Sequence, residues 1–305
     1  MKKIENVYLI GLGGIGWAYA SKLYDMQPEC IKIIVDEKRY ERYRKKGFSI
    51  NGKSYDFNYV LPEKEMQSAD LIIVSVKYHH LDKAIENIKN FVGPNTIILS
   101  LLNGISSEEI IGNVYGMDKM IYGMCVGIDA VHEENNVRFS STGKVNFGEK
   151  DNSICSEKVL AVKDLMDRAE IPYVIPENMM RALWWKFMVN VGINQSSAVL
   201  LSPYSVFQTI KEAKALMESA MVEVINISKP AGINLNLKDI DEWYNVLNSL
   251  EPENKTSMLQ DMEAHRKTEV EMFSGTVCKL GEKYGIETPV NKTLFNIIRS
   301  IEQKW

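Results

Sequence analysis

Short, almost entirely apolar runs alternate with amphipathic stretches over the first half of the chain. Residues 70–77 (DLIIVSVK) and 96–104 (TIILSLLNG) are nearly uninterrupted hydrophobic runs, which is typical of strands buried on both faces of a parallel sheet. Residues 6–25 predict a strand, a glycine turn and a helix, and the Asn51-Gly52 pair predicts a hairpin. Because strands and helices alternate, this half of the chain predicts an α/β domain.

From residue 178 onward the pattern changes to long stretches of helical periodicity, with no convincing strand. Prolines and glycines separate these stretches, as expected between helices. We therefore expect an α/β domain over residues 1–177 and an all-helical domain over residues 178–305. The predicted helices are 178–200, 204–229, 237–250, 256–284 and 290–303.

The composition narrows the class of protein. At 305 residues the chain is long enough for two domains with separate cores. A net charge of -4 argues against a nucleic-acid partner, because no excess of positive charge exists to displace phosphate counterions. The four cysteines are scattered without a C-x-x-C pair, which favours thiols in a reducing compartment over a disulfide framework.

The N-terminus superficially resembles a signal peptide, because lysines precede an apolar stretch. Glu5 and Asn6 interrupt that stretch, however, and the glycines that follow would break an apolar helix. No other run approaches the ~18 apolar residues that a membrane span needs. We expect a cytoplasmic protein with no membrane partner.

The glycine turn carries the first chemistry. Gly11, Gly13 and Gly16 form G-x-G-x-x-G between the first strand and its helix, and Asp36 ends the second strand. Such glycines permit a tight turn and close approach of a pyrophosphate, while the acid binds a ribose. A glycine-rich turn without a ligand is the alternative interpretation. We expect a Rossmann-type domain whose cofactor loop comprises Gly11, Leu12, Gly13, Gly14, Ile15 and Gly16.

Two polar residues close later strands of the predicted sheet. Lys77 ends the run 70–77, and Asn103 follows the run that begins at residue 96. Ligands of such sheets bind at the carboxyl ends of the strands, although a solvated lysine and a plain Asn-Gly turn are equally good interpretations. Adjacent His79 and His80 cannot face one way, so we expect no metal site.

The segment 181–195 (RALWWKFMVNVGINQ) is a hydrophobic helix with one polar stripe. Lys186, Asn190 and Asn194 are four residues apart, so they share one face of the helix. A core helix needs no such stripe, which raises the question of what it contacts.

A second polar segment lies in the predicted helix 256–284. Ser257 and Gln260 have the spacing of a capping box, and a helix N-terminus also attracts anions such as a substrate carboxylate. Glu269 lies further along, and taken alone it would be a solvated surface charge.

The combined motifs resemble the ketopantoate reductase (2-dehydropantoate 2-reductase) family over essentially the whole chain. The pieces that carry the resemblance are the glycine motif, SVK, LLNG, RALWWKFMVNVGIN, SMLQD, RKTEVE and YGIETPVN. The resemblance implies a Rossmann domain followed by a helical domain. It also implies a catalytic Lys186, an active-site Glu269 and a cofactor-side Lys77, with substrate contacts at Asn103, Asn190, Asn194 and Ser257.

The chemistry of these residues suits that activity. Reduction of a 2-keto acid needs a hydride from nicotinamide and a proton for the developing alkoxide, and an ammonium such as that of Lys186 can polarise the carbonyl and donate the proton. Two other interpretations stay open. An opine-type or 3-hydroxyacid dehydrogenase would favour a histidine-based pair, and no histidine lies on this helix. A non-catalytic dinucleotide sensor would need neither Lys186 nor Glu269.

The family resemblance and the individual residues favour different cofactors. The resemblance favours NADP, whereas Asp36 favours NAD because a carboxylate repels a 2′-phosphate. Arg39 follows closely and could bind that phosphate. We expect NADP first, with NAD as the alternative. The expected substrate is a small 2-keto acid, and a homodimer is one possible oligomeric state.

Overall fold

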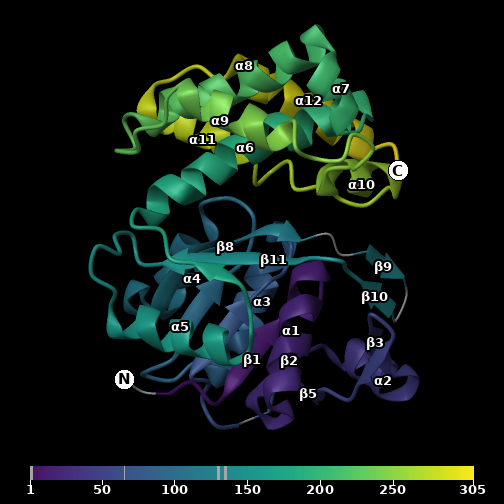
Figure 1. Cartoon of the computed structure of the whole chain (residues 1–305), viewed down its shortest axis with the longest axis vertical. Coiled ribbons are helices and arrows are strands. Elements are labelled where there is room, and N and C mark those ends of the chain that lie inside the picture. Colours follow the sequence, from purple (N-terminus) through teal and green to yellow (C-terminus); the bar gives the residue numbers. More distant parts are fainter. Residues whose placement is uncertain (1–2, 65, 129–130, 134–135) are drawn as a thin grey trace. The chain divides into compact units, whose positions relative to one another are not determined.

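The structure is a computed structural model that describes residues 3–64, 66–128, 131–133 and 136–305 (Figure 1). The chain divides into two compact units, Met1–Met179 and Met180–Trp305. None of the helices in the described part is long and apolar enough to cross a membrane.

The first unit is built on an eight-stranded sheet in the order β12-β11-β8-β7-β6-β1-β2-β5. The strands from β8 to β5 in that order run parallel, and β11 runs antiparallel to β8. Their bounds are β1 (Val7–Ile10), β2 (Ile31–Ile34), β5 (Asn58–Val60), β6 (Leu71–Val74), β7 (Ile97–Ser100), β8 (Met120–Ile128), β11 (Thr142–Gly148) and β12 (Tyr173–Val174).

Helices cover both faces of this sheet (Figure 1). Successive side chains of a strand point to opposite faces, so Val7 and Leu9 of β1 pack with Trp17 of α1, whereas Tyr8 stacks on Phe91 on the other face. The parallel, doubly covered sheet predicted from the apolar runs is confirmed. The helices are α1 (Gly14–Met26), α2 (Glu37–Lys46), α3 (Leu81–Ile88), α4 (Ser107–Tyr115) and α5 (Glu157–Arg168).

A small second sheet has the order β4-β3-β10-β9. Its first two strands form the predicted hairpin, with Asn51 and Gly52 at φ values of 49° and 80°. Two successive positive φ values match the type I′ turn that an Asn-Gly pair favours. The bounds are β3 (Phe48–Ile50), β4 (Lys53–Tyr55), β9 (Val131–Glu133) and β10 (Asn136–Arg138).

The second unit is helical, and no strand occurs between residues 180 and 305, all of which are described. The predicted helices 178–200 and 290–303 are confirmed as α6 and α12 within a residue or two. The helices are α6 (Met179–Leu200), α7 (Tyr204–Thr209), α8 (Lys211–Ser228), α9 (Lys238–Leu247), α10 (Ser257–Glu263), α11 (Ser274–Tyr284) and α12 (Pro289–Glu302).

Two predicted helices were wrong, because each is interrupted. The helix expected over 204–229 breaks at Ile210, which is extended, while Gln208 of α7 donates to the carbonyls of Leu247 and Leu250. The helix expected over 256–284 breaks after α10, where His265 adopts a left-handed φ of 49°. Tertiary hydrogen bonds hold both breaks against the local helical preference.

Candidate cofactor and active sites

The glycine turn between β1 and α1 packs directly against the end of β6. At Gly11, where φ is 102°, a Cβ would lie 2.5 Å from the carbonyl carbon of Ser75, and a Cβ at Gly16 would overlap the carbonyl oxygen of Gly11. Ser75 Oγ donates a 2.7 Å hydrogen bond to that same oxygen. Ser75 was not among the predicted residues, although its position directly after the apolar run could have revealed it.

Gly13 differs from its two neighbours in the motif, because a Cβ at this position would meet nothing within 4 Å. It is the N-cap of α1 and supplies no side-chain hydrogen bond to the helix. The N-cap of α1 therefore has open space beside it, and no side chain of the cap residue satisfies the amides of the first turn, which begins with Gly14 and Ile15. An uncapped helix start with room before it fits the pyrophosphate of a dinucleotide.

Asp36 and Arg39 lie together at the start of α2. Asp36 caps the helix by accepting a 2.8 Å hydrogen bond from the amide of Arg39, and its other carboxylate oxygen pairs with the Arg39 guanidinium. Both side chains are about half exposed. Arg42 and Arg44 donate instead to the hydroxyls of Tyr43 and Tyr40. Asp36 and Arg39 therefore form one unit at the end of β2.

Lys77 and Asn103 lie at the carboxyl edge of the sheet. β6 and β7 are parallel neighbours with Val74 opposite Ser100, so the residues that follow them emerge at the same edge. Both side chains are half-buried, and β6 also borders β1. The structure thus brings Lys77 and Asn103 to the edge that carries the glycine turn.

A buried carboxylate lies behind Asn103. Ser107 Oγ accepts from Ser100 Oγ at 2.7 Å and donates to Glu108 Oε2 at 2.9 Å, while the amide of Gly123 donates to Glu108 Oε1 at 3.3 Å. Burial raises the pKa of Glu108 to about 7. These bonds join the two ends of the Asn103 loop to β8. Sequence reasoning missed Glu108, since a Ser-Ser-Glu-Glu stretch gives no sign of burial.

In the second unit, α6 carries the polar stripe. Lys186 and Asn190 are half-buried and Asn194 is buried, whereas Trp184 and Phe187 pack in the core.

Hydrogen bonds connect α6 to the two other predicted segments. Gln195 Oε1 accepts from the amide of Ser274 at 3.1 Å, and Ser197 Oγ bonds to Thr256 Oγ1 at 3.1 Å. Ser274 and Thr256 bound the segments that carry Glu269 and Ser257. The structure therefore places both segments beside the half of α6 that holds Asn194.

The capping-box interpretation of Ser257 was wrong. Thr256 is the N-cap of α10 and accepts from the amide of Leu259 at 3.1 Å, while Ser257 is the first helical residue and is exposed. Because α10 has only seven residues, its N-terminus is a poor anion site. The Ser257 hydroxyl is left without a capping role.

Glu269 lies outside any helix, in the segment 264–273. It is half-buried between Thr268 and Val270, which are both fully buried. Its carbonyl oxygen accepts from the amides of Met272 and Phe273 at 3.0 and 3.1 Å. The backbone at Glu269 is therefore fixed on both sides.

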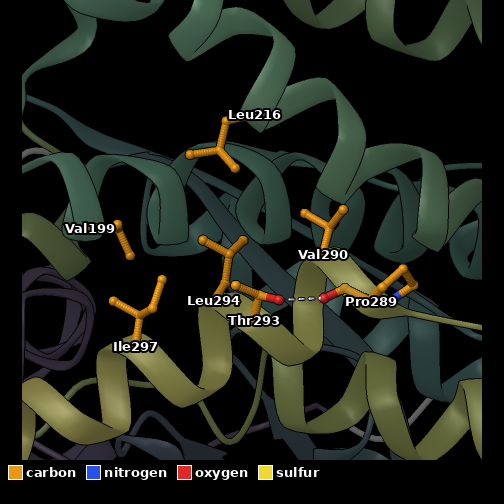
Figure 2. Close-up of a pocket in the computed structure, with 7 residues that line it drawn as sticks. All are labelled: Val199, Leu216, Pro289, Val290, Thr293, Leu294 and Ile297. Atoms are coloured by element: carbon orange, nitrogen blue, oxygen red, sulfur yellow. Dashed lines mark hydrogen bonds between the residues drawn. The ribbon is translucent and has the colours of Figure 1, made fainter.

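A pocket of about 320 Å³ in the second unit contains none of the predicted residues (Figure 2). Its walls are aliphatic apart from Thr293, whose hydroxyl donates to the carbonyl of Pro289 at 2.8 Å. Such a pocket offers no partner for a keto acid carboxylate. Among the residues that the structure describes, no cluster of three or more acidic, histidine or cysteine side chains could hold a metal ion either.

A mostly parallel sheet with a glycine turn after its first strand, followed by a helical unit, is the fold of a Rossmann-type dinucleotide-binding unit joined to a helical one. Two family models match the chain: "Ketopantoate reductase PanE/ApbA" over residues 7–152 and "Ketopantoate reductase PanE/ApbA C terminal" over residues 178–302. The chain belongs to the ketopantoate reductase family. It is therefore an oxidoreductase of a family that uses NADH or NADPH.

Individual relatives are distant but cover the whole length. The 2-dehydropantoate 2-reductase of Streptococcus pyogenes serotype M3 is 24% identical, over 97% of both chains. A D-mandelate dehydrogenase solved with NADH and anilino(oxo)acetate has a TM-score of 0.87 at 23% identity, over 98% of this chain and 99% of that one. A dimeric ketopantoate reductase from Staphylococcus aureus has a TM-score of 0.80 at 20% identity, with the same coverage.

Proposed function

We propose that this protein is a 2-dehydropantoate 2-reductase, which reduces ketopantoate to pantoate for pantothenate and coenzyme A biosynthesis. The observation that carries the proposal is the stripe of Lys186, Asn190 and Asn194 on α6, because α6 is also bonded to the segments of Glu269 and Ser257. The hydrogen bonds support the proposal because they connect α6 to segments that are far from it in sequence. A non-catalytic sensor would have no need of this arrangement.

Lys186 acts as the general acid. Its ammonium polarises the keto oxygen and donates the proton that the developing alkoxide takes up. Glu269 contacts the substrate and orients Lys186. Asn103, Asn190 and Asn194 offer neutral donors and acceptors to substrate oxygens, and the Ser257 hydroxyl donates to the carboxylate.

The first unit holds the cofactor. The turn of Gly11, Leu12, Gly13, Gly14, Ile15 and Gly16 would hold the pyrophosphate at the uncapped start of α1, and Lys77 and Asn103, at the same sheet edge, would contribute further contacts to the cofactor. When bound, NAD(P)H supplies the hydride. NADPH is the first expectation, with Arg39 on the 2′-phosphate, and NADH is the alternative, with Asp36 on the ribose hydroxyls.

The assay is oxidation of NADPH and NADH, followed by absorbance, with a panel of 2-keto acids. The proposal expects the highest kcat/KM with ketopantoate. Another 2-keto acid is the second candidate, because the similar D-mandelate dehydrogenase was solved with an anilino-substituted oxoacetate. A clear preference for an aromatic 2-keto acid would replace ketopantoate as the substrate, and no oxidation with any of the acids would contradict both assignments.

Two further features are part of the proposal. A homodimer is supported by the dimeric S. aureus relative, and light scattering on the purified protein tests it. The cytoplasmic location predicted from the sequence stays a prediction.

A further inference from the structure

The segment 264–273 has no regular structure of its own, yet it carries Glu269. Three of its residues, His265, Thr268 and Glu271, contact the end of the chain, at and after the last turn of α12. We propose that Glu302 is a positioning residue for Glu269 and acts through Thr268. This inference rests on the role that the proposed function gives to Glu269.

Glu302 binds the residue directly before Glu269. Its Oε1 accepts from the amide of Thr268 at 2.8 Å and from Thr268 Oγ1 at 2.6 Å, and its Oε2 pairs with Arg299 Nη1 at 2.9 Å. The Glu302 side chain is only 6% exposed, and Thr268 is fully buried. A buried carboxylate is unfavourable unless it is fully bonded, and here both of its oxygens have partners.

Two more contacts extend this arrangement in both directions. Arg299 Nη1 lies 3.0 Å from Glu271 Oε1, and the Trp305 ring stacks on His265 with centroids 5.4 Å apart. The chain end and the segment therefore run antiparallel, with residues 299, 302 and 305 opposite residues 271, 268 and 265. Glu302 is the central contact, and its partner Thr268 is the residue next to Glu269.

The geometry leaves Glu269 little freedom. Its own carbonyl is bonded to the next turn, and the preceding residue is held by Glu302 at both its amide and its hydroxyl. Loss of Glu302 frees the chain on the N-terminal side of Glu269, so the carboxylate shifts with its backbone. A displacement of about 1 Å in an active site can cost about 100-fold in rate.

A double-mutant cycle tests the proposal. Glu302→Ala, Glu269→Ala and the double variant are compared by kcat/KM for the keto acid that the wild type reduces fastest. We expect Glu302→Ala to lower kcat/KM at least about 10-fold in the wild type and less than about 2-fold in Glu269→Ala, because the effect of Glu302 passes through Glu269. Glu302→Gln keeps an acceptor for Thr268 and should recover most of the loss.

Asp239→Asn is the matched control. Asp239 is also a buried carboxylate of the second unit that accepts from a backbone amide, that of Asn236, and pairs with an arginine, Arg181. It should lower the melting temperature without a change in kcat/KM. If Glu302→Ala does not fold, Thr268→Val replaces it in the same cycle.

Equal losses in both backgrounds would make Glu302 purely structural and overturn the proposal, as would wild-type kcat/KM in Glu302→Ala. The role of Glu269 is read separately from Glu269→Ala alone. If that variant turns over like the wild type, the catalytic assignment is wrong and the positioning role falls with it.

Discussion

The candidate cofactor site in the first unit and the candidate catalytic site in the second unit differ in the groups that form them. The glycine turn is made of backbone: a Cβ at Gly11 or Gly16 would overlap neighbouring backbone atoms, and the groups that it offers to a ligand are the amides at the start of α1. The candidate catalytic site is made of side chains from α6, α10 and the segment 264–273, which lie up to 83 residues apart, between Lys186 and Glu269.

This difference decides how each site responds to substitution. A backbone site fails when a side chain is added, whereas a side-chain site fails when one is removed. The glycine turn itself should tolerate the loss of nearby side chains, because it offers backbone amides to the pyrophosphate. The predictions below test this contrast in order of decreasing effect.

The largest expected effect is the loss of the ammonium on α6. Lys186→Ala should lower kcat at least ~100-fold, the usual worth of a general acid, with little change in the KM for NAD(P)H. Lys211→Ala, at an exposed position in the same unit, is the control and should behave as the wild type. Near-normal turnover of Lys186→Ala on its best keto acid would remove Lys186 from the mechanism.

The buried Glu108 is an exception to this contrast, because it is a side chain that stabilises the first unit, which carries the candidate cofactor site. Burial raises its pKa to about 7 from the usual 4.5 of a glutamate. The folded state therefore binds the proton more tightly, so this contribution to stability is full below about pH 4.5 and is lost as the pH rises through 7. The negative charge of Glu109 raises the pKa of Glu108 further. The neighbouring Tyr122 has a pKa of about 12, so it stays neutral over this range of pH.

Urea unfolding at several pH values measures this effect with Glu108→Gln, which cannot titrate. Relative to this variant, the wild type should lose on the order of 3 kcal/mol of stability between pH 5 and pH 8. Glu109→Gln, at the adjacent exposed position, removes a charge that raises the pKa of Glu108, so it should keep the loss of stability and move it to slightly lower pH. A constant difference between the wild type and Glu108→Gln would show that Glu108 does not titrate in this range.

Substitutions at Gly16 and Gly13, two of the three glycines of the motif, should affect stability and cofactor binding separately. Gly16→Ala forces a Cβ onto the Gly11 carbonyl and should cost about 2 kcal/mol of stability. Gly13→Ala meets no atom of the protein, so the melting temperature should hold while the KM for NAD(P)H rises about 10-fold or more, because the methyl group fills the space for the pyrophosphate. Unchanged cofactor kinetics in Gly13→Ala would place the pyrophosphate elsewhere.

The same contrast explains which features were predictable from the sequence. The apolar runs, the glycine motif and the Asn51-Gly52 hairpin are local, so pattern alone predicted the α/β unit correctly. Glu269 was assigned to a helix because residues 256–284 have helical periodicity. In the structure the amides of Thr268 and Ser274 donate instead to Glu302 and Gln195, and the helix is interrupted between them. Bonds between residues so distant in sequence leave no periodic signal, and the catalytic residues were assigned only through the family resemblance.

Thr256 and Ser257 are adjacent, but their substitution should affect different properties, stability at Thr256 and substrate binding at Ser257. Thr256→Ala removes the cap of α10 and should cost about 1 kcal/mol of stability. Ser257→Ala should leave the melting temperature unchanged and raise the KM for the keto acid several-fold at constant kcat, because it loses a ground-state contact. The opposite pattern, with Ser257→Ala less stable and kinetically normal, would return Ser257 to a structural role.

The smallest expected effect concerns the choice between NADPH and NADH, which depends on side chains of the candidate cofactor site. Asp36 and Arg39 hold each other at the start of α2, so an attraction and a repulsion toward a 2′-phosphate lie side by side. Each is worth ~1–3 kcal/mol and they partly cancel, so discrimination between NADPH and NADH should stay below ~100-fold in kcat/KM. Asp36→Ala should shift the preference toward NADPH, and Arg39→Ala should shift it toward NADH.

Asp36→Asn separates the charge of Asp36 from its cap, because asparagine also caps a helix. It should shift the cofactor ratio in the same direction as Asp36→Ala without the loss of stability. Lys38→Ala, an exposed neighbour in the first turn of α2, is the control and should leave the ratio within about 2-fold, since an exposed ammonium is a point charge without the bidentate geometry of a guanidinium. A ratio that is unchanged in both Asp36→Asn and Arg39→Ala would mean that other residues read the 2′ position.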